Sequence, residues 1–338
     1  MSTEEHNDPI ETKDASVSPI KRIKALYSRY VKNNTVELHP TVLVLATYLL
    51  LLLSKIVDLT LINRENEYYS VVILQMMIFL LPGAIWCRFS GDGYLKRLRL
   101  TLFRASSLPL IICASLLMAS GGLLLGVLFG GTETLSQSFS LYDTFISKNN
   151  GTVPNTLYLI LAYALLPSIC EEFIYRGILC REYESGGVLR AIAFSTLFFA
   201  LMHFNVENLP VYLLAGAILA LTLYATRSLL GAVLAHFLYN IFGLFGQPYI
   251  SNLYHITRST ELFLFLMILC FLVSAAVFCG EAARLYRGYL RSGQSAAYRR
   301  PILKDTAAIR ESYLSVIKKP SAIACLAVYI IALLISFL

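Results

Sequence analysis

Charged residues are scarce in this chain. Only 14% of its 338 residues are Asp, Glu, Lys or Arg, whereas 57% are hydrophobic, and the mean hydropathy is +0.65. A soluble domain is about one-quarter charged, so this composition excludes an ordinary soluble fold and predicts a polytopic membrane protein. The formal charge of +7 comes from Lys and Arg residues that lie in short stretches between apolar segments. Such stretches are typical of membrane topology signals and do not indicate nucleic-acid binding.

Several sequence signatures are missing as well. The chain has no HExxH zinc motif, no glycine-rich phosphate loop and no CxxC pair. We expect no cleaved signal peptide, because no charged start precedes an early apolar segment. The seven cysteines lie in or beside apolar runs, which favours packing over a disulfide framework. Cys170 is adjacent to Glu171, but a thiol in apolar surroundings resists ionisation, so it is a poor candidate for a nucleophile.

Apolar segments of about the length needed to cross a bilayer, ~20 residues, recur along the chain. They predict an all-α, polytopic helical bundle with about eight or nine transmembrane helices. The nine candidates are Pro40–Ile62, Tyr69–Trp86, Ser107–Gly130, Thr156–Leu179, Val188–Phe204, Leu209–Thr226, Leu229–Phe245, Leu262–Phe278 and Ala322–Leu338.

The distribution of basic residues predicts the topology. Lys and Arg gather after the second and eighth apolar segments, and the alternate loops hold few of them. The positive-inside rule then places the N-terminus in the cytoplasm, with the plasma membrane as the default location. We expect four regions: a polar cytoplasmic tail with a candidate amphipathic segment (1–36), N-terminal helices (37–154), a core that carries the motifs described next (155–246), and C-terminal helices with a basic cytoplasmic loop (247–338).

The segment Cys170–Arg176 places two carboxylates and a guanidinium inside an apolar run. Charges in a membrane helix are costly, so each one indicates a functional site. Glu172 and Arg176 are four residues apart, which predicts an ion pair along the helix. Glu171 points about 100° away from Glu172 and remains unpaired along the helix. Glu171 is therefore the candidate for taking a proton from water, and Glu172 and Arg176 are candidate supporting residues.

Two later apolar segments carry polar residues at helical spacing. His203 follows Phe199 by four residues, so the phenyl ring could orient the imidazole, and His203 could position a water with Glu171. His236 and Asn240 are also four residues apart, and two neutral donors on one face suit a developing oxyanion. Alternatively, Glu171, His203 and His236 could ligate a divalent metal such as zinc. The residues leave the choice of cofactor open.

The predicted depths of Glu171 and His203 disagree. Glu171 lies about 24 Å along the fourth segment from its outer end, whereas His203 lies about 22 Å along the fifth from its inner end. In a hydrocarbon core of about 30 Å these depths do not coincide. A fourth helix that starts outside the membrane, or a tilted fifth helix, would bring the two residues together. Pro167 could bend the fourth helix toward the site.

The order and spacing of these residues resemble the motif set of the CAAX prenyl endopeptidase and bacteriocin-processing family of intramembrane proteases. The resemblance covers roughly Thr156 to Phe245 and rests on three motifs: Glu171-Glu172-x-x-x-Arg176, Phe199-x-x-x-His203 and His236-x-x-x-Asn240. It implies an intramembrane endopeptidase in which Glu171 and His203 activate water and His236 and Asn240 form the oxyanion site. The family is often classed with metalloproteases, so the resemblance leaves the metal open.

Two other classes of function remain as alternatives. Intramembrane carboxylates and histidines could relay protons in an ion-coupled transporter, although we find no inverted repeat of the kind that many carriers show. The same residues could also persist in a membrane scaffold or immunity-type protein that acts by binding. The partners expected for the protease are membrane lipid and a peptide or lipidated-protein substrate, without nucleic acid. The oligomeric state is left open.

Overall fold

The computed structural model describes residues 39–60, 72–91, 93–131, 156–293 and 306–336. These residues are 88% helical and contain no strand, so the predicted all-α fold is confirmed for them. By its internal contacts the chain divides into two units, Met1–Leu38 and His39–Leu338. The fold below is that of the second unit. The polar tail predicted for residues 1–36 lies outside the described residues.

The helices follow the order of the apolar segments. The N-terminal part contains α2 (Pro40–Thr60), η2 (Met76–Leu80), α4 (Leu81–Phe89), η3 (Tyr94–Arg97), η4 (Ala105–Ser107) and α5 (Leu108–Gly130). The central part contains α8 (Thr156–Leu159), η5 (Ile160–Leu165), α9 (Leu166–Glu172), η6 (Phe173–Leu179), α10 (Cys180–Tyr183), η7 (Glu184–Gly186), α11 (Val188–Leu201), α12 (Leu209–Thr226) and α13 (Leu229–Phe245). The C-terminal part contains α14 (Gln247–Thr257), α15 (Thr260–Arg291), α16 (Thr306–Ile317) and α17 (Pro320–Ser336).

Five helices of the described residues are long and apolar enough to cross a membrane, or up to seven if each of two bent helix pairs counts as one span. The sequence predicts about eight or nine. The difference has two physical sources. Val188–Leu201 is apolar but shorter than a full span, and the pairs α13–α14 and α16–α17 are bent by more than 40°. The predicted polytopic membrane bundle is confirmed, and within the described ranges some of its apolar helices are short or bent.

One helical stretch, Thr156–Gly186, carries the first motif through alternating α and π turns. Pro167 has no N–H to donate to the preceding turn, and the π segment η5 ends just before it. Carbonyls of that turn accept side-chain donors instead: Gln75 Nε2 lies 3.4 Å from Ala162 O, and Asn240 Nδ2 lies 3.4 Å from Ala164 O. The chain therefore continues as a helix beyond Pro167.

The length of this stretch removes the disagreement between the depths of Glu171 and His203. The sequence-based boundary at Leu179 was too early, because the helix runs on through α10 and η7 to Gly186. Gly187, with a φ of 110°, then allows the sharp turn into α11. Glu171 precedes Gly186, and His203 follows Val188, by the same number of residues, so each lies about 22 Å from this turn. The charges at Arg181 to Glu184 belong to the helix and do not end it.

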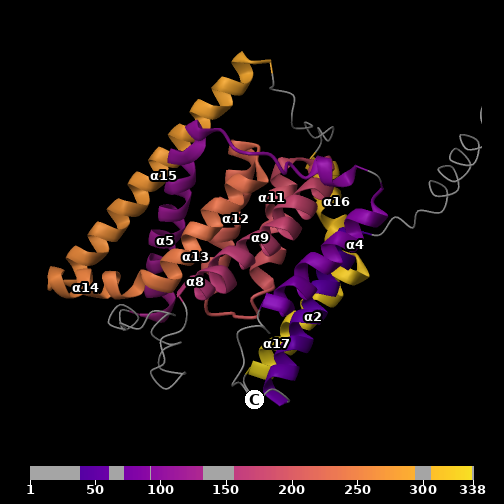
Figure 1. The fold of residues 1–338 in the computed structure, drawn as a ribbon, viewed down its shortest axis with the longest axis horizontal. Coiled ribbons are helices and arrows are strands. Elements are labelled where there is room, and N and C mark those ends of the chain that lie inside the picture. The colour runs from indigo at the N-terminus through magenta and orange to yellow at the C-terminus, as the bar shows by residue number, and fades with distance from the viewer. Residues whose placement is uncertain (1–38, 61–71, 92, 132–155, 294–305, 337–338) are drawn as a thin grey trace, which may run out of the picture. The chain divides into compact units, whose positions relative to one another are not determined.

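The motif-bearing stretch lies among other helices in the described structure. α11, α12 and α13 pack against α9 and η6, while α15 runs along α5 and α17 runs along α2 (Figure 1). The main buried hydrophobic cluster draws on α2, α4, α5, α9 to α13 and α17, and a smaller one surrounds Phe263 and Met267 of α15. Glu172 and Arg176 of the stretch Thr156–Gly186 are therefore enclosed by protein, as charges at membrane depth require.

Gly216 of α12 lets α11 and α12 approach closely. A Cβ atom built there would lie 3.1 Å from Thr196 Cγ2 and 3.2 Å from Phe199 Cδ1. We expect Gly216→Val to destabilise the protein by about 1–3 kcal/mol, because overpacking forces these neighbours apart. Thermal unfolding in detergent measures the change. Gly126→Val in α5 is the matched control, since a Cβ there meets nothing within 4 Å; equal loss of stability in both variants would contradict the packing argument.

Candidate active site

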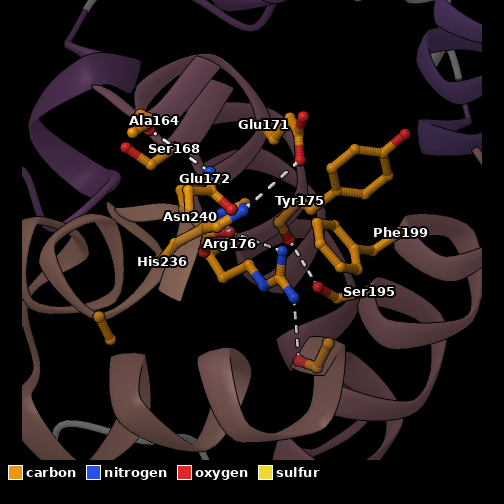
Figure 2. A network of polar contacts seen from close by, with 12 residues as sticks. Ala164, Ser168, Glu171, Glu172, Tyr175, Arg176, Ser195, Phe199, His236 and Asn240 are labelled. Atoms are coloured by element: carbon orange, nitrogen blue, oxygen red, sulfur yellow. Dashed lines mark hydrogen bonds and ion pairs between the residues drawn. The ribbon is translucent and has the colours of Figure 1, made fainter. Parts of the chain in front are cut away.

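Side chains from three helical segments meet at the carboxylate of Glu172, which is fully buried. Arg176 Nη1 donates to Glu172 Oε1 at 2.8 Å, so the ion pair predicted from the spacing is present. His236 Nδ1 lies 2.9 Å from the same oxygen (Figure 2). Because this oxygen belongs to a carboxylate held by an arginine, Nδ1 is the donor. Glu172 therefore joins α9, η6 and α13 through one oxygen atom.

Arg176 extends this network to α11 and α12. Its Nη2 donates to Gly216 O at 2.9 Å, and its guanidinium carbon lies 4.1 Å from the centre of the Phe199 ring. The arginine is 1% exposed. Burying a charge is costly unless the charge is paired and hydrogen-bonded, and here Glu172, Gly216 and Phe199 together supply that compensation. Phe199 is thus a supporting residue for the guanidinium.

Glu171 occupies a different environment from its neighbour. Its Oε2 lies 4.0 Å from His236 Nε2, and its side chain is 14% exposed, whereas that of Glu172 is 0% exposed. The two ring nitrogens of His236 therefore face the two adjacent glutamates (Figure 2). The two carboxylates point in different directions, as the 100° rotation between successive helical residues predicts. Glu172 is bonded to Arg176 and His236, whereas Glu171 is not bonded to Arg176.

His203 lies in the turn that follows α11. Its Nδ1 donates to Phe199 O at 2.9 Å, so the neutral ring carries no proton on Nε2 and can accept one there. The ring meets Phe199 edge-on, with centroids 5.1 Å apart, and the same phenyl ring contacts His236 at 5.9 Å. Phe199 thus packs against both histidines. Among the described residues, no direct hydrogen bond or ion pair joins His203 to Glu171.

Asn240 lies one turn after His236 on α13. Its amide Nδ2 donates to Ala164 O at 3.4 Å, in the turn before Pro167. This contact uses one of its two amide N–H groups. The side chain is therefore held against the central stretch on the same side as His236. All the residues of the three motifs contact the central stretch or each other, although they come from segments far apart in the sequence.

Tyr212 was missed by the sequence analysis. It lies in the first turns of α12, and its ring stacks on His203 with centroids 3.8 Å apart and an interplanar angle of 13°. Gly216, which accepts the Arg176 bond, was also missed. The only sequence signal for Tyr212 is an aromatic residue soon after a motif histidine. That signal is weak in a chain with 21 tyrosines and 19 phenylalanines.

The residues proposed for a metal do not form a preformed metal site. Within the described ranges, no group of three or more His, Cys, Asp or Glu side chains is arranged to hold a metal ion. His236 Nδ1 is engaged by Glu172, and His236 Nε2 stands 4.0 Å from Glu171 Oε2. Zinc ligands lie about 2.0–2.2 Å from the ion, and His203, the third proposed ligand, has no hydrogen bond or ion pair with Glu171 or His236 among the described residues.

A cluster of acid, base and guanidinium enclosed in an apolar helical bundle is the arrangement expected of an enzyme that works inside the membrane. Residues 153–242 match the family model described as type II CAAX prenyl endopeptidase Rce1-like. This part of the chain is therefore similar to the CAAX family of intramembrane proteases, in agreement with the motif resemblance. The match contains all three motifs. Searches of curated proteins and of solved structures found no match.

Proposed function

We propose that this protein is an intramembrane endopeptidase that hydrolyses a peptide bond with a water molecule activated by Glu171 and His203. The observation that carries the proposal is the contrast between two neighbouring carboxylates. Glu172 is bonded by Arg176 and His236 at 2.8 and 2.9 Å, whereas Glu171 stands 4.0 Å from His236 Nε2. A carboxylate that stands outside the close Glu172–Arg176 ion pair, in an apolar site, is suited to accept a proton.

The proposed reaction follows from where each group can hold a proton. Glu171 takes a proton from water as the oxygen attacks the scissile carbonyl carbon, while His203 Nε2 accepts a hydrogen bond from the same water. Asn240 and a protonated His236 Nε2 donate to the oxyanion that forms. The C–N bond then breaks, and the proton held by Glu171 passes to the leaving amine. Glu172, Arg176 and Phe199 hold the donors and bases in position.

The substrate class follows from the setting. A site enclosed by apolar helices suits a peptide that is itself held at the membrane, either a lipidated protein or a hydrophobic peptide precursor. We propose these two classes as substrates, and the cell membrane with the N-terminus in the cytoplasm as the location, since the basic loops predict that orientation. Both substrate classes offer the same chemistry to the site, namely an amide bond beside an apolar anchor.

A cleavage assay with the full chain in detergent tests the proposal. The substrates are fluorogenic peptides, each made with and without a prenyl group, and mass spectrometry locates the cleaved bond. We expect the wild type to cleave at least one membrane-anchored peptide. The Glu171→Gln and His203→Ala variants should each cleave that peptide much more slowly. Absence of cleavage by folded wild-type protein across the panel, or rescue of a cellular phenotype by Glu171→Gln, would favour the scaffold function.

Tyr212 is expected to influence catalysis by positioning His203. Tyr212→Leu removes the stacked ring, and we expect kcat to fall by about tenfold or more, because a misplaced base loses much of its effect. Tyr212→Phe keeps the ring and should retain most of the activity. The ratio of kcat between the two variants, with KM and the pH profile recorded for each, is the measurement. Equal losses in both variants would mean that the stacking does not matter.

A further inference from the structure

The segment from the last two residues of α4 to Arg104, of which residues 88–91 and 93–104 are described, lies against the ends of the central helices; we call it the basic loop. Its backbone is held by α13, because Leu229 N donates to Arg99 O at 2.9 Å, and the Ser228 hydroxyl donates to Thr101 O. Arg99 Nη2 also donates to both carboxylate oxygens of Glu184, at 2.8 and 2.9 Å. The described part of this loop is therefore tied to the end of the stretch that carries Glu171.

The outer face of the basic loop combines bulky apolar and basic side chains. Leu102 is 84% exposed, and Phe89, Leu95 and Leu100 are also exposed. Between them lie exposed basic residues: Arg88, Lys96, Arg97 and Arg104. A tied loop with exposed leucines beside lysine and arginine matches the boundary between acyl chains and headgroups, where apolar atoms enter the hydrocarbon and cations remain at the phosphates.

The described acidic side chains near the basic loop are already engaged. Glu182 accepts from the Tyr94 hydroxyl, Glu184 is held by Arg99, and Glu281 pairs with Arg284. Burial, with the bond to Glu182, raises the pKa of Tyr94 well above its usual value, so Tyr94 stays a neutral donor. Arg284 also donates to Ser106 O, next to the loop, and its charge is balanced by Glu281. The exposed lysine and arginine side chains of the basic loop thus form a predominantly positive surface.

We propose that the basic loop binds the anionic phospholipids of one membrane leaflet. Lys96 and Arg97 contact the phosphates, and Leu100 and Leu102 lie among the upper acyl carbons. The loop thereby sets the depth of the helix end at Glu184, to which it is bonded. Charge complementarity selects this occupant, because a zwitterionic lipid offers the same apolar contact without a net negative charge. The proposal does not depend on which peptide the active site cleaves.

The test is a lipid titration of the purified full chain in a neutral detergent, with thermal unfolding as the readout. Phosphatidylglycerol and phosphatidylcholine with identical acyl chains are compared. We expect the wild type to respond at a lower concentration of phosphatidylglycerol. Lys96→Gln with Arg97→Gln should raise the half-saturating concentration of that lipid by roughly 30-fold, since each cation near an anionic surface contributes about fivefold.

Two variants separate charge from apolar contact. Lys96→Arg with Arg97→Lys keeps both charges and should respond to phosphatidylglycerol as the wild type does. Leu102→Gln should weaken the response to both lipids. Equal stabilisation of the wild type by the two lipids, or an unchanged response of the Lys96→Gln and Arg97→Gln variant, would overturn the proposal. Protection by a soluble acidic peptide equal to that by phosphatidylglycerol would also overturn it and would assign the surface to a protein partner.

Discussion

Replacing Glu171 by Gln is expected to lower kcat/KM for peptide cleavage by about 10²–10⁴-fold, the range that a general base contributes. The amide has the size of the carboxylate but cannot take a proton from water. Because Glu171 Oε2 stands 4.0 Å from His236 Nε2 and Glu172 holds the ion pair, the exchange should leave the buried network intact. The loss should therefore appear mainly in kcat, with KM and the unfolding temperature close to those of the wild type.

A matched substitution separates this effect from a general loss of acidic charge. Glu207→Gln makes the same chemical change at an exposed position between α11 and α12, outside the cluster. It should leave both kcat and the unfolding temperature unchanged. If Glu171→Gln retains activity within a few-fold of the wild type while Glu207→Gln behaves as expected, Glu171 is not the base and the proposed mechanism fails.

Replacing Arg176 by Met is expected to cause the largest loss of stability, about 3–5 kcal/mol, because it leaves the Glu172 carboxylate buried without its cation. Arg176 is 1% exposed, and its loss also removes the bond to Gly216 O and the contact with Phe199. Thermal or denaturant unfolding in detergent measures the change. If the protein fails to fold, Arg176→Lys is the substitute. Lysine keeps the positive charge but cannot bond Glu172 and Gly216 O at once as the planar guanidinium does. We expect Arg176→Lys to destabilise the protein less than Arg176→Met.

The contribution of the ion pair itself is isolated by a double-mutant cycle. Arg176→Met combined with Glu172→Gln should be less destabilised than the sum of the two single variants, with a coupling of about 1 kcal/mol or more. Arg284→Met provides the control, because it breaks the exposed Glu281–Arg284 pair, and the loss of a solvent-screened pair should cost far less than that of the buried pair. Strict additivity at Glu172 and Arg176 would mean that packing, and not charge pairing, accounts for the loss.

Much of this fold follows from the sequence because membrane helices must satisfy their own backbone groups. Each of the nine apolar segments contains a helix, and the motif residues meet as their spacing implies. The spacing of Glu172 and Arg176 also predicts their ion pair correctly. Hydropathy, however, reports only composition. It does not reveal that Val188–Leu201 is short or that α13–α14 and α16–α17 are bent, so it does not distinguish a full-length span from a short or bent helix.

The parts of the site that could not be predicted depend on π turns and on contacts between distant segments. A π segment follows Glu172, and another precedes Pro167, and neither has a sequence signature. The polar residues Arg181 to Glu184 look like the end of a span, yet Glu184 is held by Arg99 and the helix continues. His236 was predicted as a neutral donor beside Asn240, but its bond to Glu172 could be found only from the packing of α13 against α9.

The pairing of α2 with α17 has a consequence for the order of synthesis. The Thr41 hydroxyl meets the Ser321 hydroxyl, and Cys325 Sγ donates to Thr41 O, so α2 finds part of its contacts in a helix made near the end of translation. At about 5–20 residues per second, the ribosome takes roughly 13–50 s to travel from Thr60 to Pro320. During that interval the face of α2 that will contact α17 is exposed to lipid. A nascent chain that stalls before α17 would therefore already contain the three motifs. Its α2 would still lack the contacts that α17 provides.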